Sequence, residues 1–400
     1  MGKHVLAKLS ILLIALLLVM VGCSKENAEE KDNENKVVDK TPSKELEEEE
    51  EKQETIPSII DFVRVSEVAQ LTGQNSVNKT EERYDVGGTD LGSIFEMDEK
   101  LYYVFGDTFG ANSTLPPGEG PTTNWRSNVV AYSTDKDPSD GIVLDGFLEE
   151  DGVAKELIPS NKLHGNFLTA IPTYGVSVND NMYLYYMAVD VWGEPGVWAT
   201  SHAGVYKSAD KGETWEKLDD LEWGIASNFT QVAIVKPNQN EAVLGEEIYF
   251  YGVKPGRYSN IQLMKVHQND IENKDKYVYF TGVDEDGNPQ WSSEEKDATN
   301  MIETTAGELS VVWNEDLQRW LLTYINGTTT NIDLVEAENP WGPWTEPKTM
   351  VSQSAYPGLY GSYMHPEFIQ DNGKTLYFTM SRWGPYNTFI MKADIVLKEE

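Results

Sequence analysis

Short runs of alternating apolar and polar residues, bounded by glycine, asparagine or aspartate, recur along the chain from residue 57 onward. This pattern is typical of β-strands joined by turns, and no amphipathic helix of convincing length interrupts it. The clearest unit is 84–110, in which the apolar runs LGSIF and LYYVF flank the polar link from Met97 to Lys100. The pattern predicts a tight β-hairpin with its turn between Asp98 and Glu99.

Five segments share this arrangement of a strand, a polar turn and a second strand rich in aromatic residues. They are Asp90 to Asp107, Thr173 to Asp190, Gln231 to Val253, Gly307 to Asn326 and Tyr363 to Trp383. The length of the chain allows either one large propeller or two sandwiches, and the repeat favours the propeller. We therefore expect an all-β, five-bladed β-propeller over residues 57–400. The strand-like stretch from Ile60 to Val68 precedes the first copy, so we expect this N-terminal strand to close the propeller by joining the last blade.

Two aspartates stand at the open end of the first hairpin. If the turn is centred between Asp98 and Glu99, then Asp90 and Asp107 are cross-strand neighbours, with Cβ atoms roughly 5 Å apart. The pKa values of carboxyl groups this close can be pushed apart, so that one group keeps its proton and the other is ionised. Glycosidases use such a pair of carboxyl groups for catalysis. Asp next to Gly at strand ends also suits ordinary turns, but Gly87, Gly88, Gly92, Gly106 and Gly110 surround the pair, and glycine within strands often marks the approach of a ligand. We expect Asp107, beside an aromatic strand, to be the general acid and Asp90 the general base.

In a propeller the open ends of all hairpins gather on one face, which predicts the rest of the site. We expect the substrate to contact polar and aromatic residues at these ends: Trp125, Arg126, Asn128, Tyr174, Gln231, Glu308, Tyr363, His365, Arg382 and Trp383. Carboxylates, amides and flat rings suit sugar hydroxyls and sugar faces. For each residue taken singly, a structural role at the end of a blade is the alternative.

The segment from Ser208 to Trp215 reads S-x-D-x-G-x-T-W. It resembles the Asp-box turn of sialidase-like propellers, in which the aspartate and the glycine shape a turn. We therefore interpret Asp210 as a turn residue and not as part of the site.

The first 23 residues have the features of a secretory signal: Lys3 and Lys8 precede an apolar run that ends at Cys23. The segment resembles bacterial lipoprotein signals, in which the cysteine is lipidated. Cys23 is the single cysteine of the chain, which excludes an intrachain disulfide. We expect lipidation of Cys23 and a location at the extracytoplasmic face of the cell membrane; a cleaved signal peptide with an idle cysteine is the alternative.

Residues 24–56 contain few large apolar side chains and include the acidic run from Glu47 to Glu51, which predicts a disordered tether. The whole chain has a formal net charge of −34. A chain this acidic repels phosphate backbones, so nucleic acid is excluded as a partner. We expect a monomer whose partners are a polysaccharide substrate and, through the lipid anchor, the membrane.

The sequence carries no clear signal for a metal or a cofactor. The histidines His4, His164, His202, His267 and His365 are too scattered for a zinc site, and no loop has regularly spaced oxygen ligands for calcium. No G-x-S-x-G elbow and no glycine-rich phosphate loop occurs. We expect no metal and no cofactor; a calcium ion on the propeller axis is the alternative.

Three motifs carry a family resemblance: GGTDLGSIF, YYVFGDTFG and WRSNVVAYSTD. Together they resemble the bacterial secreted endo-D-arabinanase family, long catalogued only as a domain of unknown function, over most of residues 84–390. The resemblance implies a five-bladed propeller that hydrolyses D-arabinofuranosyl linkages of cell-wall arabinan, with two aspartates as acid and base. The motifs GTDLG and FGDTF place those aspartates at Asp90 and Asp107.

Two other classes of function fit the same pattern. A non-catalytic glycan-binding propeller would use Asp90 and Asp107 only to hydrogen-bond sugar hydroxyls. A structural or adhesive surface protein would need only the tether and the acidity, and would have no defined glycan pocket.

Overall fold

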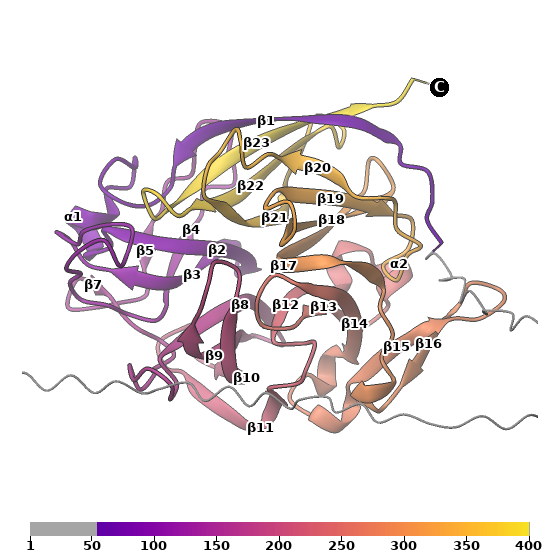
Figure 1. The fold of residues 1–400 in the computed structure, drawn as a ribbon, viewed down its shortest axis with the longest axis horizontal. Coiled ribbons are helices and arrows are strands. Elements are labelled where there is room, and N and C mark those ends of the chain that lie inside the picture. The colour runs from indigo at the N-terminus through magenta and orange to yellow at the C-terminus, as the bar shows by residue number, and fades with distance from the viewer. Residues whose placement is uncertain (1–53, 400) are drawn as a thin grey trace, which may run out of the picture. The chain divides into compact units, whose positions relative to one another are not determined.

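The computed structural model describes residues 54–399, and almost all of their regular structure is β-strand (Figure 1). The predicted signal peptide, Cys23 and nearly all of the predicted tether lie outside the described residues. The helices are short and lie between strands: α1 (Thr80–Tyr84), α2 (Glu241–Leu244) and the 3-10 turns η1 (Pro237–Gln239), η2 (Gln268–Asp270), η3 (Lys274–Lys276) and η4 (Glu295–Asp297). No helix in residues 54–399 is long and apolar enough to cross a membrane.

The first two sheets each contain four strands in sequence order. One consists of β2 (Gly88–Met97), β3 (Lys100–Phe109), β4 (Val129–Ser133) and β5 (Gly146–Phe147). The other consists of β8 (Thr169–Val178), β9 (Asn181–Trp192), β10 (Trp198–Ser208) and β11 (Glu216–Gly224). A small ribbon, β6 (Glu149–Glu150) with β7 (Val153–Ala154), comes between them along the chain.

The third and fourth groups of strands are joined into one sheet by pairing of β14 with β17. The third group consists of β12 (Gln231–Val235), β13 (Glu247–Val253), β14 (Ser259–His267), β15 (Val278–Val283) and β16 (Pro289–Ser292). The fourth consists of β17 (Ile302–Asn314), β18 (Arg319–Asn326), β19 (Ile332–Ala337) and β20 (Lys348–Val351).

The last sheet combines the two ends of the described chain. It consists of β21 (Leu359–Gln370), β22 (Thr375–Arg382), β23 (Asn387–Leu397) and β1 (Ile60–Gln70). Strand β1 pairs antiparallel with β23 along almost its whole length, from Ile60 opposite Leu397 to Gln70 opposite Phe389. This confirms that the N-terminal strand adds to the last sheet, as the sequence predicted.

The first strands of the five hairpins contact one another in a ring. β2 contacts β8, β8 contacts β12, β12 contacts β17, β17 contacts β21, and β21 contacts β2. Figure 1 shows these strands gathered around the middle of the folded unit. Their N-terminal ends are therefore available to build a shared site.

All of the predicted hairpins are present, and their turns follow from local sequence. Met97 pairs with Lys100, so the loop of the first hairpin consists of Asp98 and Glu99, which have φ angles of 51° and 64°. Asn179 and Asp180 form the corresponding loop between β8 and β9, with φ angles of 49° and 61°. Two successive residues with positive φ match the right-handed twist of paired strands, and aspartate and asparagine tolerate this conformation better than most residues.

Aromatic side chains fill the space between neighbouring sheets. Phe95 and Tyr102 pack with Tyr186 of the next sheet, and Tyr103 packs with Phe368 and Tyr377 of the last. Burying each such side chain contributes about 1.5–3 kcal/mol. This packing fixes the sheets against one another and so fixes the positions of the strand ends.

The Asp210 turn lies outside this central region. Asp210 Oδ1 accepts hydrogen bonds from Ser208 Oγ at 2.8 Å and from Thr214 N at 2.9 Å, in the link between β10 and β11. A hydrogen bond from Thr214 Oγ1 to Asp210 Oδ2 at 2.5 Å is the largest cause that lowers the pKa of Asp210 to about 2, and the bonds from Thr214 N and Ser208 Oγ add to it. Asp210 is therefore a turn residue, as the motif predicted.

Candidate active site

The two aspartates of the first hairpin face each other across a bulge. Thr89 pairs with Thr108 and Leu91 with Phe105, with a shift of register between the two pairs. Asp90 and Asp107 lie in this irregular interval. Leu91 has a φ of 64° and Gly92 a φ of 100°, so β2 bends here, and a bulge of this kind re-aims the side chains beside it.

Gly106 is needed for the position of Asp90. A Cβ atom added at Gly106 would lie 2.5 Å from Asp90 Oδ1. A Cβ atom does not come this close to a non-bonded oxygen, so a larger residue at this position would displace the carboxylate.

A cavity of about 810 Å³ opens beside the pair. The first strand of each of the five hairpins contributes one residue or more to the wall of this cavity. These strands carry Asp90 on β2, Thr173 on β8, Gln231 on β12, Glu308 on β17 and Tyr360 on β21. Its size is within the range of pockets that enclose small organic ligands. Many of the other side chains in the wall are apolar or aromatic.

Asp90 is surrounded by groups that act on its pKa in opposite directions. Its Oδ2 accepts hydrogen bonds from the hydroxyls of Tyr360 and Tyr386, each at 3.0 Å. Its Oδ1 is buried and has no hydrogen-bond partner within the described part of the chain. Burial, and after it the charge of Asp107, raise the pKa of Asp90 to about 7, against the lowering effect of the two hydroxyls.

Asp107 has stronger donors. It is only 8% exposed, and its Oδ1 accepts hydrogen bonds from Trp125 Nε1 at 2.7 Å and from Thr169 Oγ1 at 2.5 Å. Burial raises its pKa to about 6, while these two bonds and the charge of Lys162 oppose the increase. Both carboxyls therefore titrate well above an ordinary aspartate.

The surroundings of the two carboxyls differ from those expected from the sequence. Asp107 was expected to hold its proton more firmly, because it follows aromatic residues. Instead, the donors Trp125 and Thr169 stabilise its ionised form, whereas Asp90 lies in the field of both Asp107 and Glu308. The donors around Asp107 therefore favour its ionised form, and the charges around Asp90 favour its protonated form.

A third carboxylate in the cavity is neutralised by an arginine. Glu308, 8% exposed, accepts hydrogen bonds from Arg257 Nε at 2.9 Å and from Arg257 Nη2 at 2.7 Å. The Arg257 guanidinium also lies over the Tyr360 ring, 5.3 Å from its centroid, and Tyr360 donates to Asp90. Arg257 therefore links the third carboxylate to the pair.

Five of the predicted substrate-contacting residues line the cavity. They are Trp125, Gln231, Glu308, Tyr363 and Trp383. The side-chain amide of Gln231 is already used, because its Nε2 donates to the carbonyls of Lys254 and Gly256 at 3.0 and 2.9 Å.

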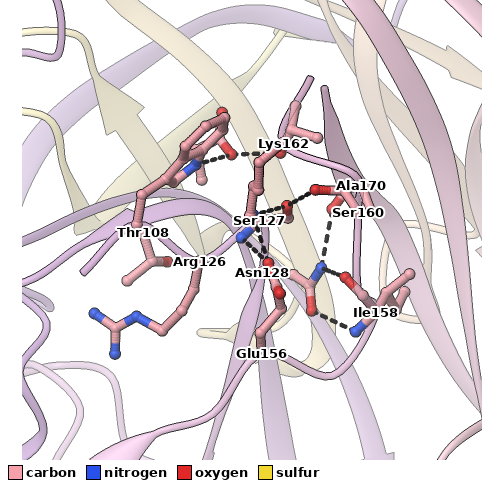
Figure 2. A network of polar contacts seen from close by, with 12 residues as sticks. Thr108, Arg126, Ser127, Asn128, Glu156, Ile158, Ser160, Lys162 and Ala170 are labelled. Atoms are coloured by element: carbon pink, nitrogen blue, oxygen red, sulfur yellow. Dashed lines mark hydrogen bonds and ion pairs between the residues drawn. The ribbon is translucent and has the colours of Figure 1, made fainter. Parts of the chain in front are cut away.

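Arg126 and Asn128 were predicted to contact the substrate, but neither lines the cavity. Figure 2 shows Asn128 within a network of polar contacts. Arg126 Nη1 donates to the carbonyl of Ala154 at 2.8 Å. Asn128 Nδ2 donates to the carbonyls of Ile158 and Ala170, at 2.8 and 3.0 Å, and so ties the first sheet to the second. Neighbouring residues at the end of a strand point in different directions. Listing the residues at the hairpin ends did not show which of them face the cavity.

The same network supports Trp125. Ser127 N donates to Glu156 Oε1 at 2.7 Å, and Lys162 Nζ donates to the same oxygen at 2.5 Å (Figure 2). The Lys162 ammonium lies 4.4 Å from the centroid of the Trp125 ring. The Trp125 ring, whose Nε1 donates to Asp107, is thus in contact with the ammonium group of Lys162.

Tyr174 and His365 lie elsewhere, in the wall of a second cavity of about 310 Å³ farther along the same strands. The reason is that the strands begin earlier than expected: β8 begins at Thr169 and β21 at Leu359. His365 is therefore six positions into its strand, roughly 20 Å from the strand start. Burial lowers the pKa of His365 to about 4.

Arg382 also points away from the aspartates. Its Nη1 donates to Glu67 Oε2 on β1 at 3.4 Å, and its guanidinium lies 5.2 Å from the centroid of the Phe389 ring. Arg382 thus helps to hold the N-terminal strand on the last sheet.

Four residues that contact the carboxylates of the cavity were missed by sequence reasoning: Thr169, Arg257, Tyr360 and Tyr386. None belongs to a motif that marks it, and each reaches the site from a different segment of the chain. Tyr386 follows the G-P turn at Gly384 and has a φ of 62°, an unusual conformation for tyrosine that could be found only in the structure.

A metal site is not apparent in the described residues, where no group of three or more histidine, cysteine, aspartate or glutamate side chains is placed to hold an ion. The carboxylates of the cavity are instead engaged by tyrosine, threonine, tryptophan and arginine donors.

Comparison with known families gives a match over residues 75–392 to the model described as "Domain of unknown function (DUF4185)". The chain belongs to this family. It is also 25% identical over 318 residues to the Notoamide biosynthesis cluster protein J of Aspergillus sp. (strain MF297-2), covering 75% of this chain and 81% of that protein.

Among solved structures, the DUF4185 chain shares its fold with a "putative hydrolase" from Bacteroides ovatus ATCC 8483, with a TM-score of 0.54 and 13% identity over 83% of this chain and 90% of that one. A looser similarity, with a TM-score of 0.48 and 16% identity over 84% and 96% of the chains, is to CoXyl43, a GH43 beta-xylosidase/alpha-arabinofuranosidase from a compost microbial metagenome. A TM-score below 0.5 is too low to support an assignment of activity.

Proposed function

We propose that this protein is a glycoside hydrolase that cleaves furanosidic linkages of a cell-wall polysaccharide, D-arabinan in the first instance. The observation that carries the proposal is the pair Asp90 and Asp107, whose pKa values are raised to about 7 and about 6 at the wall of one large cavity. General acid catalysis at neutral pH requires a carboxyl that keeps its proton, and general base catalysis requires one that does not. The sugar and the linkage come from the resemblance of GTDLG and FGDTF to the endo-D-arabinanase family.

We infer that the five sheet groups are the blades of one propeller. The ring of contacts among β2, β8, β12, β17 and β21 supports this inference, as does the pairing of β1 with β23. The fold explains why strand ends from every part of the chain meet at one cavity.

We assign the acid role to Asp90 and the base role to Asp107, in reversal of the order expected from the sequence. Asp107 Oδ1 is occupied by Trp125 and Thr169, which favours the ionised form and fixes the direction of the other oxygen. Because the pKa of Asp90 is raised to about 7, this carboxyl holds a proton in a large fraction of molecules at neutral pH and can donate it.

The charges of the cavity favour an uncharged substrate. Its wall contains Asp90, Asp107, Glu194 and Glu308, and Arg257 is already paired with Glu308. No cation in the described wall is left to bind a carboxylate or a sulfate on the sugar, so uronic acids and other anionic glycans fit poorly.

The test is hydrolysis of a panel of D-arabinan, L-arabinan, xylan, galactan and polygalacturonate by the purified protein, compared with Asp90→Asn and Asp107→Asn. Each substitution keeps size and removes the titration, so each should lower kcat at least about a hundredfold. On an activated 4-nitrophenyl arabinofuranoside, whose leaving group needs no proton, Asp90→Asn should recover most of its activity and Asp107→Asn should not. Binding of a glycan without release of sugar by the wild type would instead favour a glycan-binding propeller.

We also propose that the protein is a monomer held at the extracytoplasmic face of the membrane through a lipidated Cys23. The support is the signal-like sequence that ends at this residue and the charged segment that follows it. Cys23→Ser should release the protein from the membrane fraction, and full retention of that variant would contradict lipid anchoring.

A further inference from the structure

Two tryptophans at the cavity are unusually exposed. Trp192 is 42% exposed and Trp383 is 50% exposed, and both side chains line the cavity that contains the aspartates. Large aromatic side chains left in water at the edge of a pocket commonly serve in recognition.

The two rings lie on the sheets that flank the aspartate sheet on either side. Trp192 is the last residue of β9, in the sheet whose Thr169 donates to Asp107. Trp383 directly follows β22, in the sheet where Tyr386 donates to Asp90. The strand β2, which carries Asp90, contacts the first strands of both sheets. The aspartate pair therefore belongs to the sheet that lies between the two sheets from which the exposed rings come.

Trp192 is held in place from two directions. It meets Trp198 edge to face, with ring centroids 5.5 Å apart and an interplanar angle of 66°. The loop between them is closed by a bond from Gly193 N to the Val197 carbonyl at 2.9 Å, and Arg257 N donates to the Gly196 carbonyl at 3.0 Å. Trp192 thus immediately precedes a loop that is hydrogen-bonded to the next group of strands.

Trp383 is held in a similar way. Its backbone N donates to the Gly358 carbonyl at 2.8 Å, and its ring meets Tyr386 edge to face at 5.5 Å and 89°. Tyr386 is the same residue whose hydroxyl donates to Asp90, so the exposed ring is one side chain away from that carboxyl.

We propose that Trp192 and Trp383 are two stacking platforms for sugar rings on opposite sides of the aspartate pair, so that the preferred ligand is a glycan chain spanning both. This proposal rests on the proposed function, because it assumes that the cavity binds a glycan. An aromatic ring that is already fixed by its neighbours loses little conformational entropy on binding, which makes it an effective platform. Affinity should therefore rise with chain length until both rings are covered.

The experiment uses the full chain and D-arabinofuranosyl oligosaccharides of increasing length, together with the activated 4-nitrophenyl arabinofuranoside. In the wild type, KM should fall as the chain lengthens. Trp192→Ala and Trp383→Ala should each raise KM for the longest oligosaccharide by about tenfold or more, and each should raise it by a larger factor than KM for the short activated substrate. Phe62→Ala removes a comparably exposed aromatic ring, 39% exposed on β1 and outside the cavity wall, and should change neither value.

Failure of the inference and failure of the proposed function give different results. One outcome is that the wild type hydrolyses these substrates and both tryptophan variants keep its dependence of KM on chain length. The proposal of two stacking platforms is then wrong, and the proposed hydrolase function is retained. If the wild type releases no sugar, retention of the same variants in affinity gels containing each polymer of the panel still tests the platforms. Loss of retention in both tryptophan variants would support them. Retention equal to wild type, or no retention of the wild type by any polymer, would overturn them.

Discussion

The hydroxyl of Tyr386 lies 3.0 Å from Asp90 Oδ2, although 296 positions separate the two residues in the sequence. This bond joins the last sheet to the first and stabilises the ionised form of Asp90. Burial outweighs it, so the pKa of Asp90 still rises to about 7.

Removing this hydroxyl should shift the pH dependence of catalysis. In Tyr386→Phe the ionised form of Asp90 loses a donor, so its pKa should rise further. If Asp90 is the general acid, the decline of kcat/KM at alkaline pH should move to higher pH. The measurement is a pH–rate profile, with Tyr377→Phe, a buried tyrosine of β22 outside the cavity wall, as the control. A shift toward lower pH would contradict the assignment.

Gly106→Ala should disable the site without unfolding the protein. The added methyl would lie 2.5 Å from Asp90 Oδ1, so the carboxylate must move, and a displacement of about 1 Å costs on the order of a hundredfold in rate. Gly224→Ala is a matched control, because a Cβ at Gly224 meets nothing within 4 Å. Circular dichroism should show both variants folded, and equal activity of the two would refute the steric argument.

Asp90→Asn should stabilise the fold at alkaline pH. The pKa of Asp90 is about 7 in the native state and close to 4 in an unfolded chain, so between these values the native state binds the proton more tightly. Stability is therefore lost as pH rises through this window, and the substitution removes the loss. We expect a gain on the order of 1–3 kcal/mol at pH 8 and little gain at pH 4.

Thermal or urea unfolding at the two pH values measures this difference. The exposed Asp220→Asn is the control. A gain for Asp90→Asn that is the same at both pH values would show that ionisation of this carboxyl is not its cause.

The pair formed by Arg257 and Glu308 should show strong coupling. Arg257→Met leaves the nearly buried Glu308 without its partner, which should cost about 2–4 kcal/mol of unfolding free energy. Glu308→Gln in the same chain should restore part of the loss, because the uncompensated charge is gone. A double-mutant cycle by urea unfolding measures the coupling, and strictly additive effects would mean that the pair contributes no interaction of its own.

Much of the fold follows from the sequence because its determinants are local. Alternating residues and two-residue turns specify the hairpins, and counting from the Asp98-Glu99 turn already makes Asp90 and Asp107 neighbours. Pairing of β1 with β23 was also predictable, since an N-terminal strand without a partner in its own repeat must cover an edge.

Only the tertiary structure decided what surrounds the aspartates. Tyr360, Tyr386, Arg257 and Thr169 reach the pair because the sheets pack in a ring, and no local pattern encodes contacts across such separations. These contacts shift the pKa values of both carboxyls, since a pKa depends on every donor and charge within a few ångströms. Likewise, His365 was assigned to the wrong cavity because β21 begins four residues earlier than expected, which places His365 near the middle of the strand and not at its start. The sequence thus determined which residues pair along the chain, and packing between sheets determined the chemistry that the pair can perform.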